Sequence, residues 1–195
     1  MTGLFGGAFD PPHNGHVALA RKGASHFGLD PLIVLVNAAP GHKQVATPPE
    51  ARLELARAAF PEYEVELDPH ALTIELLETG RWDDPLFLVG ADEFARFFEI
   101  WYRPEDVVEL ARLGVATRPG FERAVLEEVR SQLARPDRVE FFEIEPLPVS
   151  SHEIRDLVAR GEAIDDLVPP AVASRIAELG LYRGQDYTKS IDQRN

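Results

Sequence analysis

Short apolar runs alternate with segments of helical spacing along most of the chain. A first strand is expected to end at Leu4-Phe5, and strand-like runs follow at 32–36, 63–67, 86–89, 113–117 and 139–142. Apolar residues recur every three or four positions, as on one face of a helix, at 17–27, 50–60, 104–112, 121–133, 151–160 and 170–179. Strands that alternate with helices predict an α/β fold: a Rossmann-like, doubly wound, mostly parallel sheet with helices on both faces.

The length of the chain and the composition of its end predict one domain. The 195 residues contain no internal repeat, and at about 100–200 residues per domain they favour a single unit over 1–183. Within that unit, 151–183 form a C-terminal helical part. Residues 184–195 are polar, and we expect them to be a disordered tail.

The composition excludes several kinds of site. Because the chain has no cysteine, it has no disulfide, thiolate nucleophile or cysteine-based zinc site. The first residues lack the basic and apolar regions of a signal peptide, and no run approaches the ~18 apolar residues of a membrane helix. We therefore expect a cytoplasmic protein that does not associate with a membrane.

The net charge of −13 narrows the choice of ligand. A surface this acidic repels nucleic acid, so nucleic acid is not expected as a partner. A free nucleotide remains acceptable where cations and backbone N–H groups gather at one site. The oligomeric state stays open, with a homo-oligomer as one alternative.

The residues after the first strand give the strongest signal for phosphate binding, because ligands of such sheets bind at the carboxyl ends of the strands. Gly6 and Gly7 let the backbone approach a ligand closely and take positive φ. The helix that follows offers N–H donors and a partial positive charge at its N-terminus. His13 and His16 are three positions apart, so they share a face of that helix once it has begun, and two imidazoles there stabilise charge on phosphate oxygens.

A tight turn with two surface histidines is the alternative interpretation of this segment. A Gly-Gly turn alone favours that alternative, whereas two histidines that flank a glycine directly after such a turn are more specific. The segment matches neither G-x-G-x-x-G nor G-x-x-x-x-G-K-[ST], so it supports neither a dinucleotide oxidoreductase nor a P-loop NTPase.

A second helix start offers another phosphate cradle. Ser150 and Glu153 have the spacing of a capping box before an apolar run. The cap leaves the hydroxyl of Ser151 spare, and Arg155 follows one turn later. Together with the free N–H groups of the helix start, these two side chains suit a phosphate.

Four more positions are candidates for ligand contacts, and each has a structural alternative. Lys43 is either a mobile cation at the ligand edge or a solvated loop lysine. Asp92 either binds a ribose hydroxyl or caps a helix, and Trp101 either stacks on an aromatic ligand or belongs to the core. Arg118 is either a ligand contact or a surface cation in a turn.

The chain resembles the bacterial nicotinate-nucleotide adenylyltransferases, which belong to the nucleotidyltransferase superfamily with an H-x-G-H motif. The matching motifs are Gly6-Gly7-Ala8-Phe9-Asp10-Pro11-Pro12-His13-Asn14-Gly15-His16 and Ser150-Ser151-His152-Glu153-Ile154-Arg155, with His42-Lys43, Gly90-Ala91-Asp92, Trp101-Tyr102-Arg103 and Arg118-Pro119-Gly120 between them, and Leu167-Val168-Pro169 through Gly180-Leu181-Tyr182 at the end. The resemblance implies a Rossmann-like fold of nucleotidyltransferase type. It also implies an enzyme that transfers the adenylyl group of ATP to nicotinate mononucleotide, giving nicotinate adenine dinucleotide and pyrophosphate in NAD biosynthesis.

The same resemblance implies roles for individual residues. His13, His16 and Arg155 act in catalysis. The residues on the ATP side are Gly6, Gly7, Phe9, His13, His16, Ser150, Ser151 and Arg155. Those on the acceptor side are Asn37, Lys43, Thr73, Asp92, Trp101 and Arg118. Mg²⁺ enters with ATP and is held through the substrate phosphates, without a dedicated protein site.

One segment departs from the family and leaves the acceptor open. Where relatives have Ser-Tyr-Thr and then Asp-Thr one residue later, this chain has Leu72 for the Tyr, retains Thr73, and has Glu75-Leu76 for the Asp-Thr pair. Another acceptor is one alternative: nicotinamide mononucleotide, pantetheine phosphate or, with CTP, a polyol phosphate. A non-catalytic nucleotide-binding regulatory module is another. A site of backbone N–H donors without a nearby carboxylate is expected to prefer nicotinate to the neutral nicotinamide.

Overall fold

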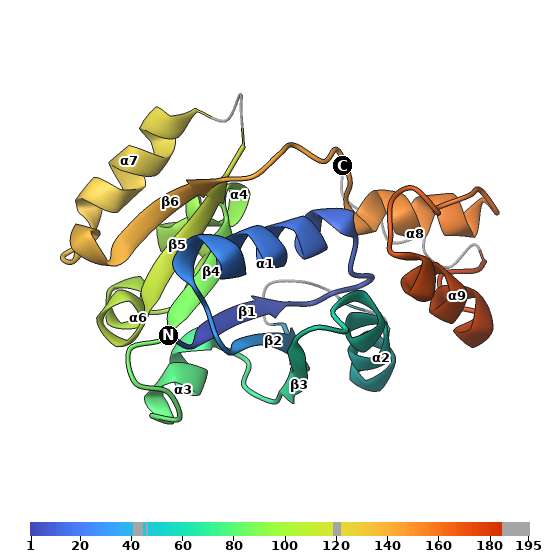
Figure 1. Ribbon diagram of the computed structural model, residues 1–195, viewed down its shortest axis with the longest axis horizontal. Coiled ribbons are helices and arrows are strands. Elements are labelled where there is room, and N and C mark those ends of the chain that lie inside the picture. The colour runs from blue at the N-terminus through green and yellow to red at the C-terminus, as the bar shows by residue number, and fades with distance from the viewer. Residues whose placement is uncertain (41–44, 46, 119–121, 185–195) are drawn as a thin grey trace.

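A sheet of six parallel strands organises the part of the chain that the computed structural model describes, residues 1–40, 45, 47–118 and 122–184 (Figure 1). The strands lie in the order β3-β2-β1-β4-β5-β6. Their bounds are β1 (Gly3–Gly7), β2 (Leu32–Asn37), β3 (Glu64–Asp68), β4 (Leu86–Gly90), β5 (Arg112–Thr117) and β6 (Val139–Glu143). The order reverses between β1 and β4, as in a doubly wound Rossmann-like sheet, so the predicted fold class is confirmed.

Helices cover both faces of this sheet. The described helices are α1 (Asn14–Phe27), α2 (Pro49–Ala59), α3 (Thr73–Glu78), α4 (Ala91–Phe94), α5 (Phe97–Ile100), α6 (Pro104–Leu110), α7 (Arg123–Gln132), α8 (Ser151–Ala159) and α9 (Pro170–Leu179), with a 3-10 turn, η1 (Pro136–Arg138). None of them is both long and apolar enough to cross a membrane.

The continuous apolar runs of the sequence correspond to strands that are buried on both faces. In β2, Val34 and Val36 belong to the core that also contains residues of α1, α2, α8 and α9. Ile33 and Leu35 of the same strand belong to a second core, with residues of α3 to α7. Successive side chains of a strand point to opposite faces, so a strand between two helical layers has no polar side.

Some elements differ from the sequence prediction at their ends. The helix predicted over 104–112 ends at Leu110, and Arg112 begins β5, where its N–H donates to the carbonyl of Pro85 at 2.8 Å. The helix predicted over 121–133 begins at Arg123, and Phe121 lies outside the described residues. The helical periodicity did not predict α3, α4, α5 or η1, because helices of three to six residues are too short to show it.

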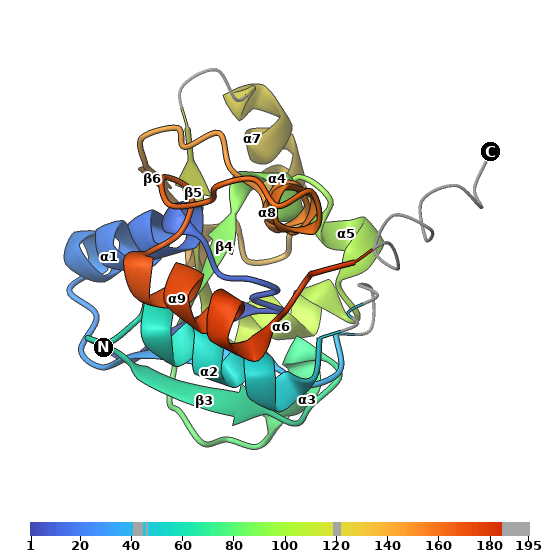
Figure 2. The same cartoon turned by 90° about the vertical axis from the view of Figure 1, so that its right-hand side faces the viewer.

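The C-terminal helices pack beside the end of β1. Figure 2 shows α9 lying across α2, and Arg175 of α9 forms an ion pair with Glu54 of α2 at 3.1 Å. After α9, the buried Tyr182 hydroxyl donates to the carboxylate of Asp10 at 2.7 Å. The predicted tail from 184 onward lies outside the described residues, apart from Gly184.

A substitution of Gly114, in the middle of β5, can test how closely α1 packs against the sheet. A Cβ at this position would lie 2.7 Å from the Phe27 ring and 2.8 Å from the side chain of Leu86. We expect Gly114→Ala to lower the free energy of unfolding by about 1–3 kcal/mol, because the core is already filled. Urea denaturation measures this loss.

The matched control is Gly90→Ala at the end of β4. A Cβ there meets nothing within 4 Å, and the φ of −77° suits any residue. This variant is expected to change the stability by less than about 1 kcal/mol, because the restriction of the unfolded chain by alanine offsets the loss of glycine at the N-cap of α4. If Gly114→Ala were as stable as Gly90→Ala, the packing argument would be wrong.

Candidate functional site

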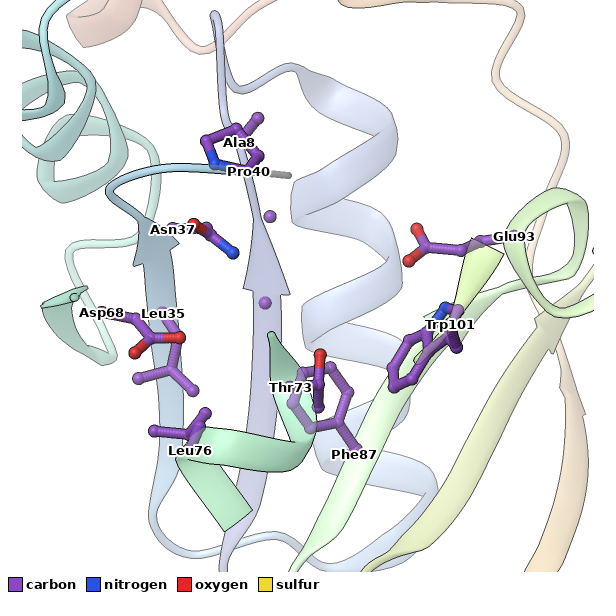
Figure 3. A pocket seen from close by; sticks show the side chains of 12 residues that line it. Ala8, Leu35, Asn37, Pro40, Asp68, Thr73, Leu76, Phe87, Glu93 and Trp101 are labelled. Carbon is purple, nitrogen blue, oxygen red and sulfur yellow. The ribbon is translucent and has the colours of Figure 1, made fainter. Parts of the chain in front are cut away.

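A hollow lies at the carboxyl ends of the strands, next to the point where the strand order reverses. It is lined by Gly6, Gly7, Ala8, Leu35, Asn37, Pro40, Asp68, Thr73, Leu76, Phe87, Glu93 and Trp101. Figure 3 shows Asn37 and Asp68 on one side of it and Glu93 and Trp101 on the other. The fold therefore brings together Asn37, Thr73 and Trp101, three of the predicted acceptor-side residues, with the glycines that end β1.

Gly6 and Gly7 are needed for a different reason from the one the sequence suggested. Neither has a positive φ. A Cβ on Gly6 would lie 2.8 Å from the Phe87 ring, and a Cβ on Gly7 would lie 2.8 Å from the ring of Phe9. The glycines therefore make room for aromatic rings beneath the loop, in addition to leaving bare backbone at the wall of the hollow.

The positive φ that the sequence predicts for the glycines is found at Phe9 instead. Its φ is +49°, in the left-handed region that non-glycine residues rarely occupy. Its ring is buried and packs edge-on against Phe5, Phe60 and His16 at centroid distances of 5.2–5.5 Å. Since the ring belongs to the core, only the backbone of Phe9 is available to a nucleotide.

His13 and His16 cap the start of α1 reciprocally. The N–H of His16 donates to Nδ1 of His13 at 3.4 Å, and the N–H of His13 donates to Nδ1 of His16 at 3.2 Å. The two rings stack with centroids 3.7 Å apart. A neutral imidazole whose Nδ1 accepts a hydrogen bond carries its proton on Nε2, so the cap leaves each neutral ring with an Nε2–H donor.

Gly15 allows the His13 ring to lie over the helix start. A Cβ at this position would lie 3.1 Å from two atoms of the His13 ring and 3.4 Å from Val149. Such contacts are tight, so a side chain there would require the ring to shift by a few tenths of an ångström. The glycine of the H-x-G-H motif thus leaves room for the histidine pair.

Burial keeps His13 neutral. Desolvation lowers the pKa of the His13 imidazole from 6.5 to about 4. Two stacked imidazolium cations would repel each other, which agrees with a neutral ring. Near neutral pH, His13 is therefore a hydrogen-bond donor without a charge.

The start of α1 has fewer spare N–H donors than the sequence suggested. The N–H of Asn14 donates to the carbonyl of Leu167 at 2.9 Å, and the N–H of His16 is used in the cap. The side chain of Asn14 donates to the carbonyl of Asp166 at 3.0 Å. Much of this helix start is thus bonded to the segment before α9, which leaves fewer backbone donors for a phosphate.

The second predicted cradle is also partly occupied by structural bonds. Ser150 caps α8 by accepting from the N–H of Glu153 at 3.1 Å, which is one of the two bonds of the predicted capping box. The Ser151 hydroxyl, expected to be spare, donates to the carbonyl of Pro11 at 2.8 Å. Arg155 donates through Nη1 to the carbonyl of Asp10 at 2.7 Å. These two side chains join α8 to the loop that follows β1.

Asp92 and Arg118 lie outside the lining of the hollow and pair with each other. Nη2 of Arg118 lies 3.3 Å from the Asp92 carboxylate, and both side chains are exposed. This pair links the start of α4 to the end of β5. Lys43, His42, Pro119 and Gly120 lie outside the described residues.

Two carboxylates line the hollow, which contradicts the expectation of a site without them. The buried Asp68, at the end of β3, accepts from the N–H and the ring Nδ1 of His70 at 3.0 and 2.7 Å. The half-buried Glu93, in α4, has no hydrogen bond or ion pair from its carboxylate to a described residue. Neither carboxylate could be predicted from local sequence patterns, because both positions depend on which strand and helix ends meet.

The segment that departs from the family lies at the rim of this hollow. Leu72 lines an adjoining hollow of about 390 Å³ together with Thr73, Trp101 and Tyr102. Its N–H donates to the carboxylate of Glu75 at 3.3 Å, so Glu75 caps the start of α3. Leu72 and Leu76 therefore line hollows that Trp101 also lines.

Arg52 is a residue of the site that the sequence analysis missed. It lies in α2, is 1% exposed, and donates to the carbonyls of Ala8, Asn37, Ala38 and Thr47 at 2.7–3.1 Å. The other buried positions of this helix are Leu55, Ala56 and Ala59. An arginine in phase with an apolar stripe was the signal that could have identified it.

Comparisons with known proteins agree with this architecture. A family model described as cytidylyltransferase-like matches residues 4–157. A probable nicotinate-nucleotide adenylyltransferase of Chlorobaculum parvum is 34% identical over 198 residues, which cover 93% of this chain and 98% of the relative. Another, of Solibacter usitatus, is 35% identical over 92% of this chain and 97% of the relative. The Plasmodium falciparum nicotinic acid mononucleotide adenylyltransferase complexed with NaAD is similar in fold, with a TM-score of 0.75 and 18% identity over 93% of this chain and 96% of the other.

The low pKa of His13 predicts a pH dependence of stability. Between pH 6.5 and about 4, the unfolded chain binds a proton at His13 that the folded chain does not. The free energy of unfolding should therefore fall as the pH is lowered through this window, by up to about 1.4 kcal/mol per pH unit from this group. His13→Asn keeps a capping acceptor but does not titrate.

The measurement is urea denaturation of the wild type and His13→Asn at several pH values from 4 to 7. The difference between the two proteins isolates His13 from the carboxylates that titrate in the same range. We expect the wild type to lose more stability than the variant on acidification. Parallel curves would show that His13 titrates normally in the folded protein.

Proposed function

Because this chain belongs to the nicotinate-nucleotide adenylyltransferase family, we propose that it transfers the adenylyl group of ATP to nicotinate mononucleotide, forming nicotinate adenine dinucleotide and pyrophosphate. The relatives at 34–35% identity over nearly the full length of the chain support this assignment. We place the activity in the cytoplasm, where ATP is available.

One observation carries the proposal: the stacked and reciprocally capped pair of His13 and His16. Both rings follow the loop that lines the hollow, and the cap places the proton of a neutral ring on Nε2. Two such donors at one helix start suit phosphate oxygens that gain negative charge during a reaction. A protein that only binds a nucleotide would not need that pairing.

The chemistry requires alignment more than proton transfer. An oxygen of the acceptor phosphate, already ionised near neutral pH, attacks the α-phosphorus of ATP. The new oxygen–phosphorus bond forms as the bond from the α-phosphorus to the bridging oxygen of the β-phosphate breaks, and pyrophosphate leaves. No general base is needed, so the protein must reduce the repulsion between the two anions and hold them in line.

The ATP-side residues are proposed to contact different parts of the triphosphate. We assign the Nε2–H groups of His13 and His16 to the phosphate that is attacked. Arg155, whose Nη1 holds the Asp10 carbonyl, offers its remaining N–H groups to the triphosphate. Ser150 and Ser151 start α8 beside it, and the backbone of Gly6, Gly7 and Phe9 forms the loop underneath.

Mg²⁺ is proposed to enter with ATP. No group of three or more His, Asp or Glu side chains among the described residues could hold a metal ion. The ion would therefore bind phosphate oxygens and water, as Mg²⁺ often does. No step above depends on a protein ligand to the metal.

On the acceptor side, Trp101 is our candidate for stacking on the pyridine ring. Its indole is held edge-on by Phe87 at 5.8 Å and lies 4.9 Å from Phe97. Asn37 and Thr73 add polar groups to the same wall. Asp92 and Arg118 remain candidates only if their mutual ion pair opens, and Lys43 is proposed from the sequence alone.

Nicotinamide mononucleotide is a second candidate acceptor, favoured by the two carboxylates of the hollow. A neutral amide can donate to Asp68 or Glu93, whereas the carboxylate of nicotinate must avoid them. The pyridinium ring of either acceptor is positive and is compatible with Glu93. The choice of nicotinate therefore rests on the family, and a direct comparison of both acceptors must decide it.

A turnover assay tests the proposed activity. Purified protein is incubated with ATP and each of four acceptors: nicotinate mononucleotide, nicotinamide mononucleotide, pantetheine phosphate and a polyol phosphate, the last also with CTP. We expect release of pyrophosphate to be fastest with ATP and nicotinate mononucleotide. In His16→Ala, kcat should fall about 10²–10³-fold with little change in KM, as for removal of one donor to a transition-state charge.

The outcomes separate the alternatives. Faster turnover of another acceptor would replace nicotinate mononucleotide while keeping adenylyl transfer. Nucleotide binding without turnover would favour a regulatory module. A kcat unchanged in His16→Ala would remove His16 from the catalytic residues.

Substitutions at the two walls test the placement of the ring. Trp101→Ala should raise KM for the acceptor by about 2–12-fold, since ring stacking contributes ~0.5–1.5 kcal/mol beyond buried area, and should leave KM for ATP unchanged. Leu72→Tyr should lower KM for the acceptor, because it restores an aromatic side chain in a hollow that Trp101 also lines. Trp101→Phe is the control that keeps a ring. An effect of Trp101→Ala on ATP alone would place the pyridine ring elsewhere.

A further inference from the structure

One buried guanidinium joins the two loops that would hold the two substrates. Nη1 of Arg52 donates both to the carbonyl of Ala8 at 2.7 Å and to that of Asn37 at 2.8 Å. Nη2 donates to the carbonyl of Ala38 at 3.0 Å. Ala8 belongs to the loop that leads to the histidine pair, whereas Asn37 and Ala38 end β2 and begin the loop on the acceptor side.

A buried charge costs free energy, so an arginine at this position indicates that its hydrogen bonds have a role. Burial lowers the pKa of Arg52, and the nearby Asp10 opposes that effect. A side chain that only packed α2 against the sheet could be apolar, like Leu55 one turn later, which is fully buried. Apolar residues often replace buried charges without loss of stability, so stability alone does not explain the arginine.

The planar guanidinium of Arg52 can bind several carbonyls at once, which an apolar side chain cannot. A guanidinium presents five N–H donors in one rigid plane, and this one reaches four carbonyls from three segments of the chain. Its bonds therefore fix the position of the loop after β1 relative to the loop after β2.

We propose that Arg52 is a positioning residue for adenylyl transfer, which sets the distance and angle between the ATP-side loop and the acceptor-side loop. The inference rests on the proposed function. In-line attack requires reacting atoms about 3–3.5 Å apart, and an error of about 1 Å can cost 10²-fold in rate. The ATP-side loop is also held from α8 by Ser151 and Arg155, so it should keep its affinity for ATP when Arg52 is changed.

The test compares Arg52→Lys with Leu55→Ala. Lysine keeps the charge and the long stem but replaces the planar fork with a point charge. We expect kcat of Arg52→Lys per folded molecule to fall about 10–100-fold while Kd for ATP, measured by calorimetry, changes by less than about threefold. Leu55→Ala, in the same helix, should lower the urea midpoint of unfolding without lowering kcat per folded molecule.

Each result decides the proposal. A kcat per folded molecule equal to that of the wild type, or a rise in Kd for ATP that matches the loss in kcat, would overturn it. If Arg52→Lys is too unstable to assay, Arg52→Gln and the addition of trimethylamine N-oxide, which favours the folded state, provide the same comparison of kcat with Kd. An inactive wild type would overturn the proposed function, whereas an active wild type with an equally active Arg52→Lys would overturn only the role of Arg52.

Discussion

The site depends on hydrogen bonds to the backbone of the loop between β1 and α1. The carbonyls of Ala8, Asp10 and Pro11 accept from Arg52, Arg155 and Ser151 respectively. An unsatisfied buried carbonyl costs about 1–3 kcal/mol, so each of the three donors stabilises this shape of the loop. The donors lie in α2 and α8, so distant parts of the chain determine the conformation of its first loop.

Because the same helices also form one of the two cores, folding and construction of the site are coupled. Residues of α1, α2, α8 and α9 share a single apolar cluster on one face of the sheet. Tyr182 adds a bond to the carboxylate of Asp10 from the segment after α9. The loop is therefore organised before any substrate arrives, which avoids reorganisation during the reaction.

The two halves of the proposed site differ in charge. Arg52 and Arg155 lie beneath and beside the loop on the ATP side, and a neutral His13 adds a donor there without a charge. On the acceptor side the described wall carries the carboxylates of Asp68 and Glu93. In a protein with a net charge of −13, this separation favours phosphates at one end and a pyridinium ring at the other.

The sequence by itself determined the features that depend on neighbours along the chain. The alternation of strands and helices, the spacing of His13 and His16, and the cap at Ser150 are local, since periodicity and capping involve residues within about one turn or one strand. The tertiary structure alone decided the burial of Arg52, the pairing of Asp92 with Arg118, and the arrival of Asp68 and Glu93 at one hollow. It also explains why positions 6 and 7 are glycine: the rings of Phe87 and Phe9 occupy the space that a Cβ would need at Gly6 and Gly7. Whether a polar side chain is buried, paired or exposed depends on partners that only the packing of distant elements brings within reach.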